Sequence, residues 1–466
     1  MGHAKKAKVE HTIDVSSDRI SSLPQDIKAK ILSNLNTDMA VRASVLSSAW
    51  RNVWTIIPDI FLCDCKFCSC NDGPASDSSE AFSISARSKF VTLVDMALSL
   101  HKGPLDAFTI HGTHSYHDAF ARWMYMLSTK GPGVITIKLK SGPQYKIPSS
   151  LFYMSHLHFL YLKNCSISLP KKFEGFKSLK VLKLKVFSST DSDISNLISS
   201  CPLLDEVHLV YFEGINCLTI QAQALQLLKI EGNFEDLCVE APNLVIMYLR
   251  LDNGEGYQSV PVQGDRKSYL KQTFGSLTCI ERLNIGGSFL TYLSKGCMLA
   301  KVPGVFDHLE VFCIERCLWR WTEVVAACSL FQNAPLLSEL DIWSYPRPEA
   351  FTRKGIWDQD ETELQAPKLD HLILITLNDF MGLDCEVSLL GLLLSWAPAL
   401  EEMKINVAED TTDKRIFKAA KKLLALPTPQ GLYQSQDHTY LIPSVVAPSC
   451  RCTCGDFAAV SSRCTL

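Results

Sequence analysis

The sequence predicts an α/β protein in which a short N-terminal module of three helices precedes a solenoid, with parallel strands on the concave face and helices or loops on the convex face. Near the N-terminus, apolar residues recur at every fourth position from Leu23 to Leu35, as on one side of an amphipathic helix. From Leu105 onward a six-residue pattern recurs twelve times: apolar, two others, apolar, one other, apolar. A strand repeated in this way indicates a repeat array rather than separate domains.

Composition restricts the class of protein and of partner. Of the 466 residues, 47% are hydrophobic and 20% are charged, which is typical of a folded globular protein. The formal charge of −3 gives no global basic field for nucleic acid, and the apolar stretch Val387–Leu400 is too short to span a bilayer, so we expect neither partner. The 18 cysteines are scattered and residues 1–17 hold no apolar signal core, so we expect reduced thiols in the nucleus or cytoplasm.

Residues 23–55 contain signals for three short helices. Pro24 suits the first turn of a helix, and Asp26 places negative charge near the positive end of the helix dipole. A second helix is expected after Thr37 and a third after Ser47, where serine and threonine cap helices. Helices totalling about 35 residues bury too little apolar surface to fold alone. The apolar stripe is therefore expected to be an interface; the alternative is that the helices cap the next domain.

This segment, LPQDIKAKILSNLNTDMAVRASVLSSAWRNVWT, resembles an F-box. The resemblance rests on the initial Leu-Pro, the apolar stripe, the Asp38/Arg42 pair, Val45-Leu46-Ser47 and Trp50-Arg51 followed by Trp54. Ala49 stands where the family often carries Lys or Arg. F-boxes dock on the Skp-type adaptor of cullin–RING (SCF) ubiquitin ligases, so the resemblance implies that this segment binds that adaptor. The implied adaptor-binding residues are Leu23, Pro24, Ile27, Ile31, Leu32, Leu35, Val45, Leu46, Trp50 and Trp54.

The recurring pattern is the leucine-rich-repeat consensus, and Cys165 in LHFLYLKNC matches its consensus cysteine. Five prolines each lie two residues before the first apolar residue of a unit, where proline ends a helix and turns the chain into a strand: Pro202, Pro242, Pro335, Pro367 and Pro398. Helical returns are expected at 191–201 and 323–334, and a projecting loop at 252–269. The units begin at Leu105, Val134, Leu157, Leu179, Leu204, Leu225, Leu244, Ile280, Leu309, Leu337, Leu369 and Leu400.

Residues 364–407 resemble the FBD region of plant F-box proteins, through a strand, an acidic loop, a helix and the ending APALEEM. Together the resemblances cover residues from about 18 to 427. After Leu426 the sequence is turn-rich and weakly patterned, so disorder is expected there. The predicted organisation is a flexible N-terminus (1–17), F-box (18–60), cysteine-containing linker and helix (61–100), leucine-rich-repeat solenoid (101–362), FBD-like terminal repeats (363–427) and disordered tail (428–466).

The sequence shows no catalytic constellation: it has no P-loop, G-x-S-x-G, H-E-x-x-H or dinucleotide fingerprint. We therefore expect a protein that is not an enzyme and that needs no cofactor or metal. The segment CDCKFCSC contains four closely spaced cysteines: Cys63, Cys65, Cys68 and Cys70. They are predicted to be free linker thiols, because the two ligand pairs of a zinc site usually come from separated turns. A zinc site is the alternative. His111, His114 and His117 are similarly expected to be surface polar residues rather than metal ligands.

The strand pattern predicts which side chains line the concave face, because alternate residues of a strand point to opposite sides. Units from Val134 to Leu244 place mostly basic residues there, interrupted by Glu231. A positive concavity suits an acidic or phosphorylated target, although solvation alone also explains surface charge. The predicted target-binding residues are Lys138, Lys140, Tyr161, Lys163, Lys183, Lys185, His208, Lys229, Tyr248, Arg250 and Trp343.

Two functions follow from these patterns. The first is an F-box substrate adaptor that docks on the Skp-type subunit of an SCF ligase and presents a target, bound to its leucine-rich repeats, for ubiquitination. The alternative is a leucine-rich-repeat scaffold or small-molecule-dependent sensor that binds partners without directing ubiquitination. In both, catalysis belongs to other proteins.

Overall fold

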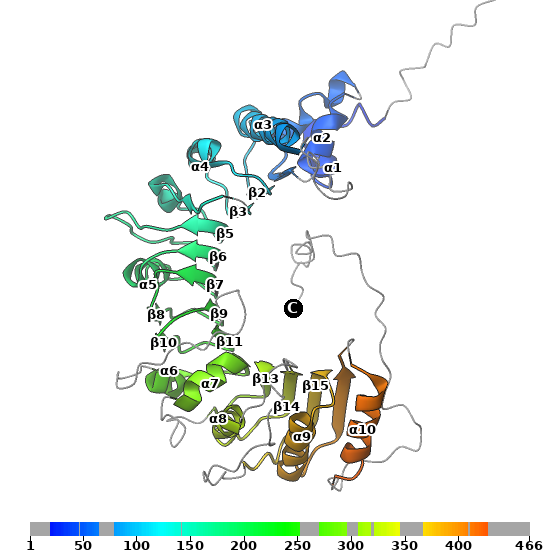
Figure 1. Cartoon of the computed structure of the whole chain (residues 1–466). Coiled ribbons are helices and arrows are strands. Elements are labelled where there is room, and N and C mark those ends of the chain that lie inside the picture. Colours follow the sequence, from blue (N-terminus) through cyan, green and yellow to red (C-terminus); the bar gives the residue numbers. More distant parts are fainter. Residues whose placement is uncertain are drawn as a thin grey trace, which may run out of the picture. The chain divides into compact units, whose positions relative to one another are not determined.

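A computed structural model shows two compact units, residues 1–309 and 310–466, and each is described here by itself. Figure 1 shows the chain coloured along the sequence. Among the helices that the structure describes, none is long and apolar enough to cross a membrane. The described residues are 19–45, 47–64, 79–140, 142–251, 270–295, 306–317, 321–344, 367–408 and 411–426.

The first unit opens with the predicted helical module. Helices α1 (Gln25–Leu32) and α2 (Thr37–Ala43) lie where the sequence places them. The predicted third helix is instead two short 3₁₀ helices, η2 (Ser48–Trp50) and η3 (Val53–Ile56). They are separated because Asn52, with φ −114° and ψ 7°, leaves the helical conformation.

The solenoid of the first unit is a parallel sheet whose strands follow the chain order. From β2 to β12 each of these strands except β3 begins two residues after the first apolar residue of its predicted unit. Strand β3 begins at Val134 itself and pairs it with Phe159, so this unit is shifted by two residues from its prediction. Strand β1 also joins this sheet beside β2, so the solenoid begins at Asp59, not at the predicted 101. The strands are β1 (Asp59–Cys63), β2 (Ala107–Gly112), β3 (Val134–Leu139), β5 (Phe159–Ser166), β6 (Val181–Ser188), β7 (Glu206–Glu213), β9 (Leu227–Gly232), β11 (Ile246–Leu251) and β12 (Arg282–Gly286), with β4 (Tyr145–Lys146) beside the end of β5.

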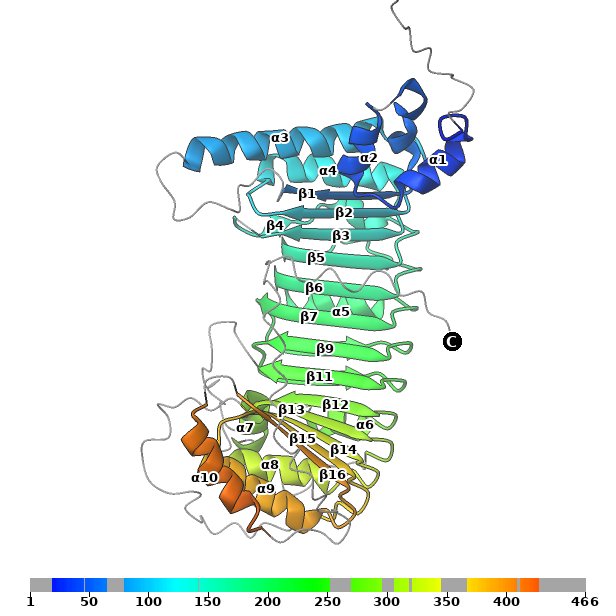
Figure 2. The same ribbon diagram turned by 90° about the vertical axis from the view of Figure 1, so that its right-hand side faces the viewer.

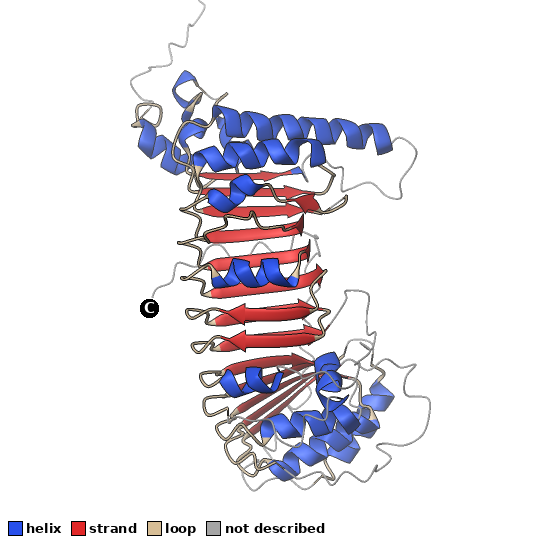
Figure 3. Ribbon diagram, turned by 90° about the vertical axis from the view of Figure 1, so that its left-hand side faces the viewer, coloured by secondary structure: helices blue, strands red, loops and turns tan. Residues whose placement is uncertain are grey.

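The returns between these strands cover one face of the sheet, as Figure 3 shows, and Figure 2 shows the opposite, helix-free face of β3–β11. Helix α5 confirms the predicted helical return, and its cap residue Thr190 accepts a 3.2 Å hydrogen bond from the backbone N–H of Asp193. The predicted loop at 252–269 lies outside the described residues. The returns are α3 (Ser79–Leu100), α4 (His117–Lys130), η5 (Ser149–Tyr153), α5 (Asp191–Ser199), the strand pair β8 (Cys217–Gln221) and β10 (Asp236–Glu240), α6 (Leu270–Ser276) and α7 (Gly287–Lys295).

The second unit contains a parallel sheet of four strands in chain order, with the predicted return at 323–334 present as α8. One unit is shifted from its prediction. A turn at Asp370 and His371 precedes Leu372, so the strand pattern starts there and not at Leu369. The elements are β13 (Val311–Cys317), α8 (Trp321–Phe331), β14 (Glu339–Ser344), β15 (Leu374–Phe380), α9 (Asp384–Trp396), β16 (Glu402–Val407) and α10 (Asp413–Leu423).

Helix α10, which the sequence analysis does not anticipate, follows the last strand. Its Lys422 donates a 2.5 Å hydrogen bond to Asp384 at the start of α9. The N-terminus of α9 is held by buried Glu386, which accepts hydrogen bonds from the Ser344 hydroxyl (2.6 Å) and the Leu383 N–H (2.9 Å). The predicted tail, 428–466, lies outside the described residues.

Candidate protein-binding surfaces

The helical module carries a set of exposed apolar side chains on and beside α1 and α2. Ile31 is 42% exposed and Val45 is 86% exposed, although both are large hydrophobic residues. Leu23 is half-buried and Pro24 is exposed. The apolar patch, as we name this set, consists of Ile27, Ile31, Leu35, Met39 and Val45. Apolar groups gathered on a small folded module are typical of an interaction site.

The other predicted adaptor-binding residues differ in position from the patch. Leu32, Trp50 and Trp54 are buried in the module's own core together with Ala29, Ala40, Val53 and Ile57. Their role is therefore to hold the module together, because a buried side chain presents no surface to a partner. Leu46 lies outside the described residues.

Two kinds of contact hold the helical module in place: contacts within the module itself, and backbone contacts that join it to the first repeat. The Nζ of buried Lys28 donates a 2.6 Å hydrogen bond to the carbonyl of Ser21 and lies 5.8 Å from the Trp50 ring centre. Downstream, the Lys102 N–H donates to the carbonyl of Thr55 at 2.7 Å. Nε2 of His101 lies 2.8 Å from the carbonyl oxygen of Ile57. Burial lowers the pKa of His101, which favours a neutral ring in this contact.

On the helix-free face of the first unit, three lysines lie side by side. Lys138, Lys163 and Lys185 occupy paired positions on β3, β5 and β6, and we call them the lysine ladder. Neighbouring strands are about 4.8 Å apart, so three like charges project from adjacent positions. Lys138 Nζ lies 4.9 Å from the Tyr161 ring centre, and Lys185 Nζ lies 6.0 Å from that of Tyr211.

A second row of the same face runs in register from β5 to β11, and the carboxylate of Glu206 lies beside it. Glu206 Oε1 is 2.7 Å from Lys183 Nζ and 2.6 Å from His208 Nε2. These contacts, with His208 making the largest contribution, hold the pKa of Glu206 at about 2. The row consists of Tyr161, Lys183, His208, Lys229 and Tyr248.

A second carboxylate, Glu231, holds the cations farther along the face. Burial opposes its ionisation, but its cationic and hydroxyl neighbours outweigh that effect and lower the pKa of Glu231. Arg250 Nη1 lies 2.9 Å away, the Tyr211 hydroxyl donates at 2.8 Å, and Lys229 Nζ lies at 3.5 Å. Tyr211 has a positive φ of 55°, a rare conformation for a tyrosine, immediately after the alternating part of β7.

Comparison with known proteins identifies the two regions just described. The F-box domain model matches residues 20–61, and the model "FBD-associated F-box protein At5g56370, LRR repeats" matches residues 120–342. The chain therefore carries an F-box at its N-terminus, followed by a region of leucine-rich repeats. As an F-box protein it has the architecture of an adaptor of SCF-type ligases, and neither matched model describes a catalytic domain.

Relatives from Arabidopsis thaliana extend this likeness along the F-box/LRR chain. The F-box/FBD/LRR-repeat protein At1g13570 is 29% identical over 406 residues, covering 86% of this chain and 93% of the relative. The FBD-associated F-box protein At4g10400 is 26% identical over 341 residues, 69% of this chain and 76% of the relative. The F-box/FBD/LRR-repeat protein At2g04230 is 33% identical over 230 residues, 47% and 49% of the two chains.

Besides Glu231, the predicted basic face carries a second acid, Glu206. Glu206 and Glu231 pair with Lys183, His208, Lys229 and Arg250. Trp343 lies on β14, in the second unit. Lys140 lies just beyond the end of β3 and is exposed.

Two residues of these surfaces were not predicted from the sequence, although their spacing could have identified them. Met39 continues the four-residue spacing of Ile31 and Leu35 and is exposed like them. Glu206 occupies the first outward position of its strand, which the alternation rule identifies. The role of Tyr211 has no such signal, because it depends on a local positive φ.

The residues weighed as metal ligands lie in different settings. His114 Nδ1 is 3.2 Å from buried Asp64, which also accepts a 2.7 Å hydrogen bond from the Tyr116 hydroxyl. His117 instead stacks on Tyr145, with ring centres 4.1 Å apart. Within the described residues, no group of three or more His, Cys, Asp or Glu side chains is placed to hold a metal ion. Cys63 ends β1, and Cys65, Cys68 and Cys70 lie outside the described residues.

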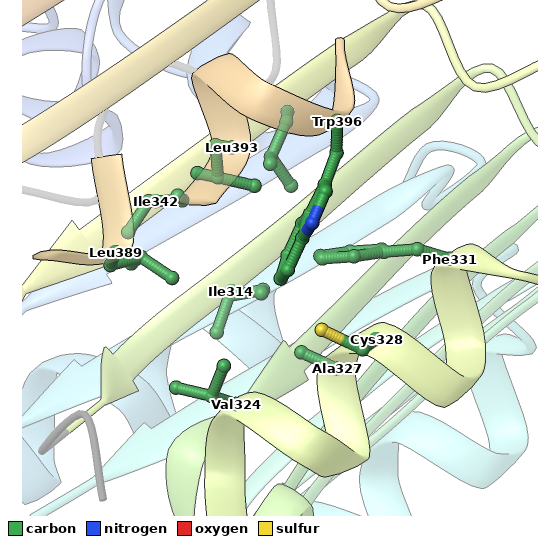
Figure 4. Close-up of a pocket in the computed structure, with 10 residues that line it drawn as sticks. Ile314, Val324, Ala327, Cys328, Phe331, Ile342, Leu389, Leu393 and Trp396 are labelled. Carbon is green, nitrogen blue, oxygen red and sulfur yellow. The ribbon is translucent and has the colours of Figure 1, made fainter. Parts of the chain in front are cut away.

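A small apolar cavity lies in the second unit between its strands and helices α8 and α9 (Figure 4). Its volume is about 10 Å³, which is room for a single water at most. The walls are apolar and include Ile314, Ile342, Phe331 and Trp396. This cavity therefore offers no room for the small-molecule ligand that the sensor alternative requires.

Proposed function

We propose that this protein docks on the Skp-type adaptor of an SCF ubiquitin ligase through the apolar patch, and that its leucine-rich repeats hold an acidic or phosphorylated target for ubiquitin transfer. Catalysis belongs to the other subunits of the ligase. The F-box itself implies a Skp1-type partner.

Adaptor docking is supported by the presence of two separate sets of apolar residues in the module, one buried and one exposed. One set of apolar residues, including Leu32 and Trp54, already forms a core. A second set, including Ile31 and Val45, remains exposed after that core is complete. Exposed large hydrophobic residues cost free energy in water, and burial against a partner recovers about 25 cal/mol for each Å² of apolar surface. The patch is thus available for a partner without unfolding the module.

Target binding is supported by the lysine ladder. Three ammonium groups in register favour an anion that contacts more than one of them, since each ion pair also relieves repulsion between neighbours. The adjacent Tyr161 adds aromatic surface, which is enriched in protein interfaces. Glu206 and Glu231 lie 2.7 Å from Lys183 and 2.9 Å from Arg250, which are cations outside the ladder.

The backbone contacts between module and solenoid support presentation of a target in a defined position. The Thr55 carbonyl accepts from Lys102, and Phe61 donates a 2.8 Å hydrogen bond to the Thr37 hydroxyl. The F-box and the first strand are therefore connected without a long linker. A target bound on the sheet of the first unit would be held at a restricted distance from the adaptor.

Calorimetric titration of the full chain with a purified Skp-type adaptor tests the docking surface. Replacing Ile31 by Asp introduces a charge into the patch, and we expect the dissociation constant to rise at least about tenfold. The matched control is Ile84→Asp, because Ile84 is also an exposed isoleucine but lies on α3. Unchanged affinity in Ile31→Asp, or an equal loss in both variants, would rule out this docking surface.

A further inference from the structure

We propose that the helix-free face of β13, β14 and β15 binds a lysine- or arginine-bearing segment of a partner protein, with Trp343 as the aromatic contact and Asp341 as the counter-charge. This surface lies in the second unit, and the proposal does not depend on adaptor docking or on the lysine ladder.

Strand register defines the surface. Trp343 on β14 is paired with Glu315 on β13 and with Asn378 on β15. Asp341, two residues earlier on the same side of β14, is paired with Cys313 and Thr376. The residues that alternate with the core positions are Val311, Cys313, Glu315, Glu339, Asp341, Trp343, Leu374, Thr376 and Asn378. Val311 and Cys313 are buried, and the other seven are half-buried or exposed.

The other side of these strands is fully occupied. Ile314 and Ile342 face α8 and α9, where they line the apolar cavity with Phe331 and Trp396 (Figure 4). Trp343 points away from that core and is 44% exposed. It is therefore not needed to fill the interior of the unit. An exposed indole at the centre of three strands is the residue type that most often dominates a binding surface.

Two acids of β14, Glu339 and Asp341, lie on this face, and its nine alternating residues include no Lys, Arg or His. Among the described residues, the carboxylates of Glu339 and Asp341 make no hydrogen bond or ion pair. Lys404, farther along the same sheet, lies 3.1 Å from Glu402. By contrast, the acids of the first unit have partners: Glu206 contacts Lys183 and His208, and Glu231 contacts Lys229 and Arg250.

An indole beside a carboxylate selects a cationic side chain. Residues two apart on a strand are about 6.5–7 Å apart, so one long side chain can reach both Asp341 and Trp343. A guanidinium or ammonium group is attracted to the face of an indole and pairs with a carboxylate, while its methylene groups cover the ring. Arginine fits best because its planar group stacks on the ring and also donates hydrogen bonds sideways.

The test monitors Trp343 directly in the full chain. The protein has eight tryptophans, so ¹⁵N-tryptophan labelling gives a small set of indole signals, and Trp343→Phe assigns the relevant one. The probe is the peptide acetyl-Gly-Ser-Arg-Gly-Arg-Ser-Gly-amide, and its matched partner has citrulline at both arginines. We expect the Trp343 signal to shift saturably with the arginine peptide and to stay unchanged with the citrulline peptide.

Two variants distinguish specific binding of the arginine peptide at Asp341 and Trp343 from non-specific electrostatic attraction between the peptide and the protein. Asp341→Asn should raise the dissociation constant of the arginine peptide at least about fivefold, since it removes the counter-charge. Glu213→Gln removes the same charge from an exposed position in the first unit and should leave that constant unchanged. Unperturbed signals from the other tryptophans in each variant show that the fold is intact.

Three results would overturn the proposal. The first is an equal response to the arginine and citrulline peptides. The second is an equal weakening by Asp341→Asn and Glu213→Gln. The third is a shift of the Trp343 signal, without any peptide, when Arg347, Arg353 and Lys354 are all replaced by Gln, because the occupant would then be this chain's own segment and not a partner.

Discussion

Ile31 and Leu32 follow one another on α1 and face opposite environments. The Ile31 side chain is 42% exposed, whereas Leu32 is 2% exposed and packs in the core with Trp50 and Trp54. Because helical neighbours point about 100° apart, one turn of α1 contributes both to the core and to the apolar patch. The two residues therefore provide a matched pair for separating folding from binding.

Truncation of Leu32 is expected to destabilise the module without removing any exposed surface. Leu32→Ala leaves a cavity in the core and should cost about 2–5 kcal/mol of unfolding free energy. Hydrogen exchange of residues 25–57, followed by mass spectrometry, should become faster in this variant. Ile31→Ala should leave exchange within error of the unmodified protein and weaken adaptor binding instead. Faster exchange in Ile31→Ala, or weaker adaptor binding without faster exchange in Leu32→Ala, would contradict the assignment of Leu32 to the core and of Ile31 to the apolar patch.

Glu206 gives the sheet of the first unit a defined pH dependence. Its folded pKa of about 2 lies below its ordinary value of 4.5, so its stabilising contribution is fully present above pH 4.5 and is lost as the pH falls toward 2. Glu206→Gln should therefore be less stable than the unmodified protein at pH 7, and this difference should shrink between pH 4.5 and 2. Urea unfolding at pH 7, 4 and 3 measures it; a difference that stays constant across this range would contradict the assignment.

Charge reversal on the lysine ladder is expected to weaken anion binding. Lys163→Glu with Lys185→Glu should lower the affinity for a fluorescent peptide bearing two phosphoserines by at least about tenfold, and should flatten its salt dependence. Glu206→Gln should raise the affinity instead, because it removes the carboxylate that neutralises Lys183. Anisotropy titrations at two salt concentrations measure both effects.

The control for the ladder is Lys171→Glu with Lys172→Glu, an equal charge change on an exposed turn that follows β5. This control should leave peptide affinity nearly unchanged. If it weakens binding as much as reversal within the ladder, the peptide responds to overall charge and the helix-free face is not its site.

Much of the fold was predictable because its signals are periodic. The strands from Ala107 onward follow an apolar pattern that recurs in each repeat, so each repeat gave the same prediction. Pro202, two residues before Leu204, lies in a turn as predicted. The start at β1 was missed because the pattern of Ile57, Ile60 and Leu62 was divided between two predicted segments: Ile57 and Ile60 lie in the predicted F-box (18–60), and Leu62 lies in the predicted linker (61–100). The shift from Leu369 to Leu372 arose because two overlapping apolar sets compete in that stretch.

The binding surfaces were less predictable, because exposure and pairing depend on tertiary contacts. The spacing of Ile27, Ile31 and Leu35 identified the exposed side of α1. It could not show that Leu32, Trp50 and Trp54 are buried in the module's own core. Alternation placed the lysines on one face, but not the pairing of Arg250 with Glu231 across two strands.

Thiol reactivity should follow burial along the solenoid. Nine cysteines of the described residues are free thiols. Burial raises the pKa of Cys165 strongly, and raises that of Cys201 to about 11 and those of Cys328 and Cys385 to about 12, so few of these groups are reactive thiolates at pH 8. Cys217 and Cys279 are exposed and should react with iodoacetamide in the native protein, whereas the four buried thiols should react only after denaturation. Peptide mapping after brief alkylation measures each site. Equal labelling of Cys165 and Cys217 under native conditions would show that the interior of the repeats opens readily, and would contradict the packing described for β5.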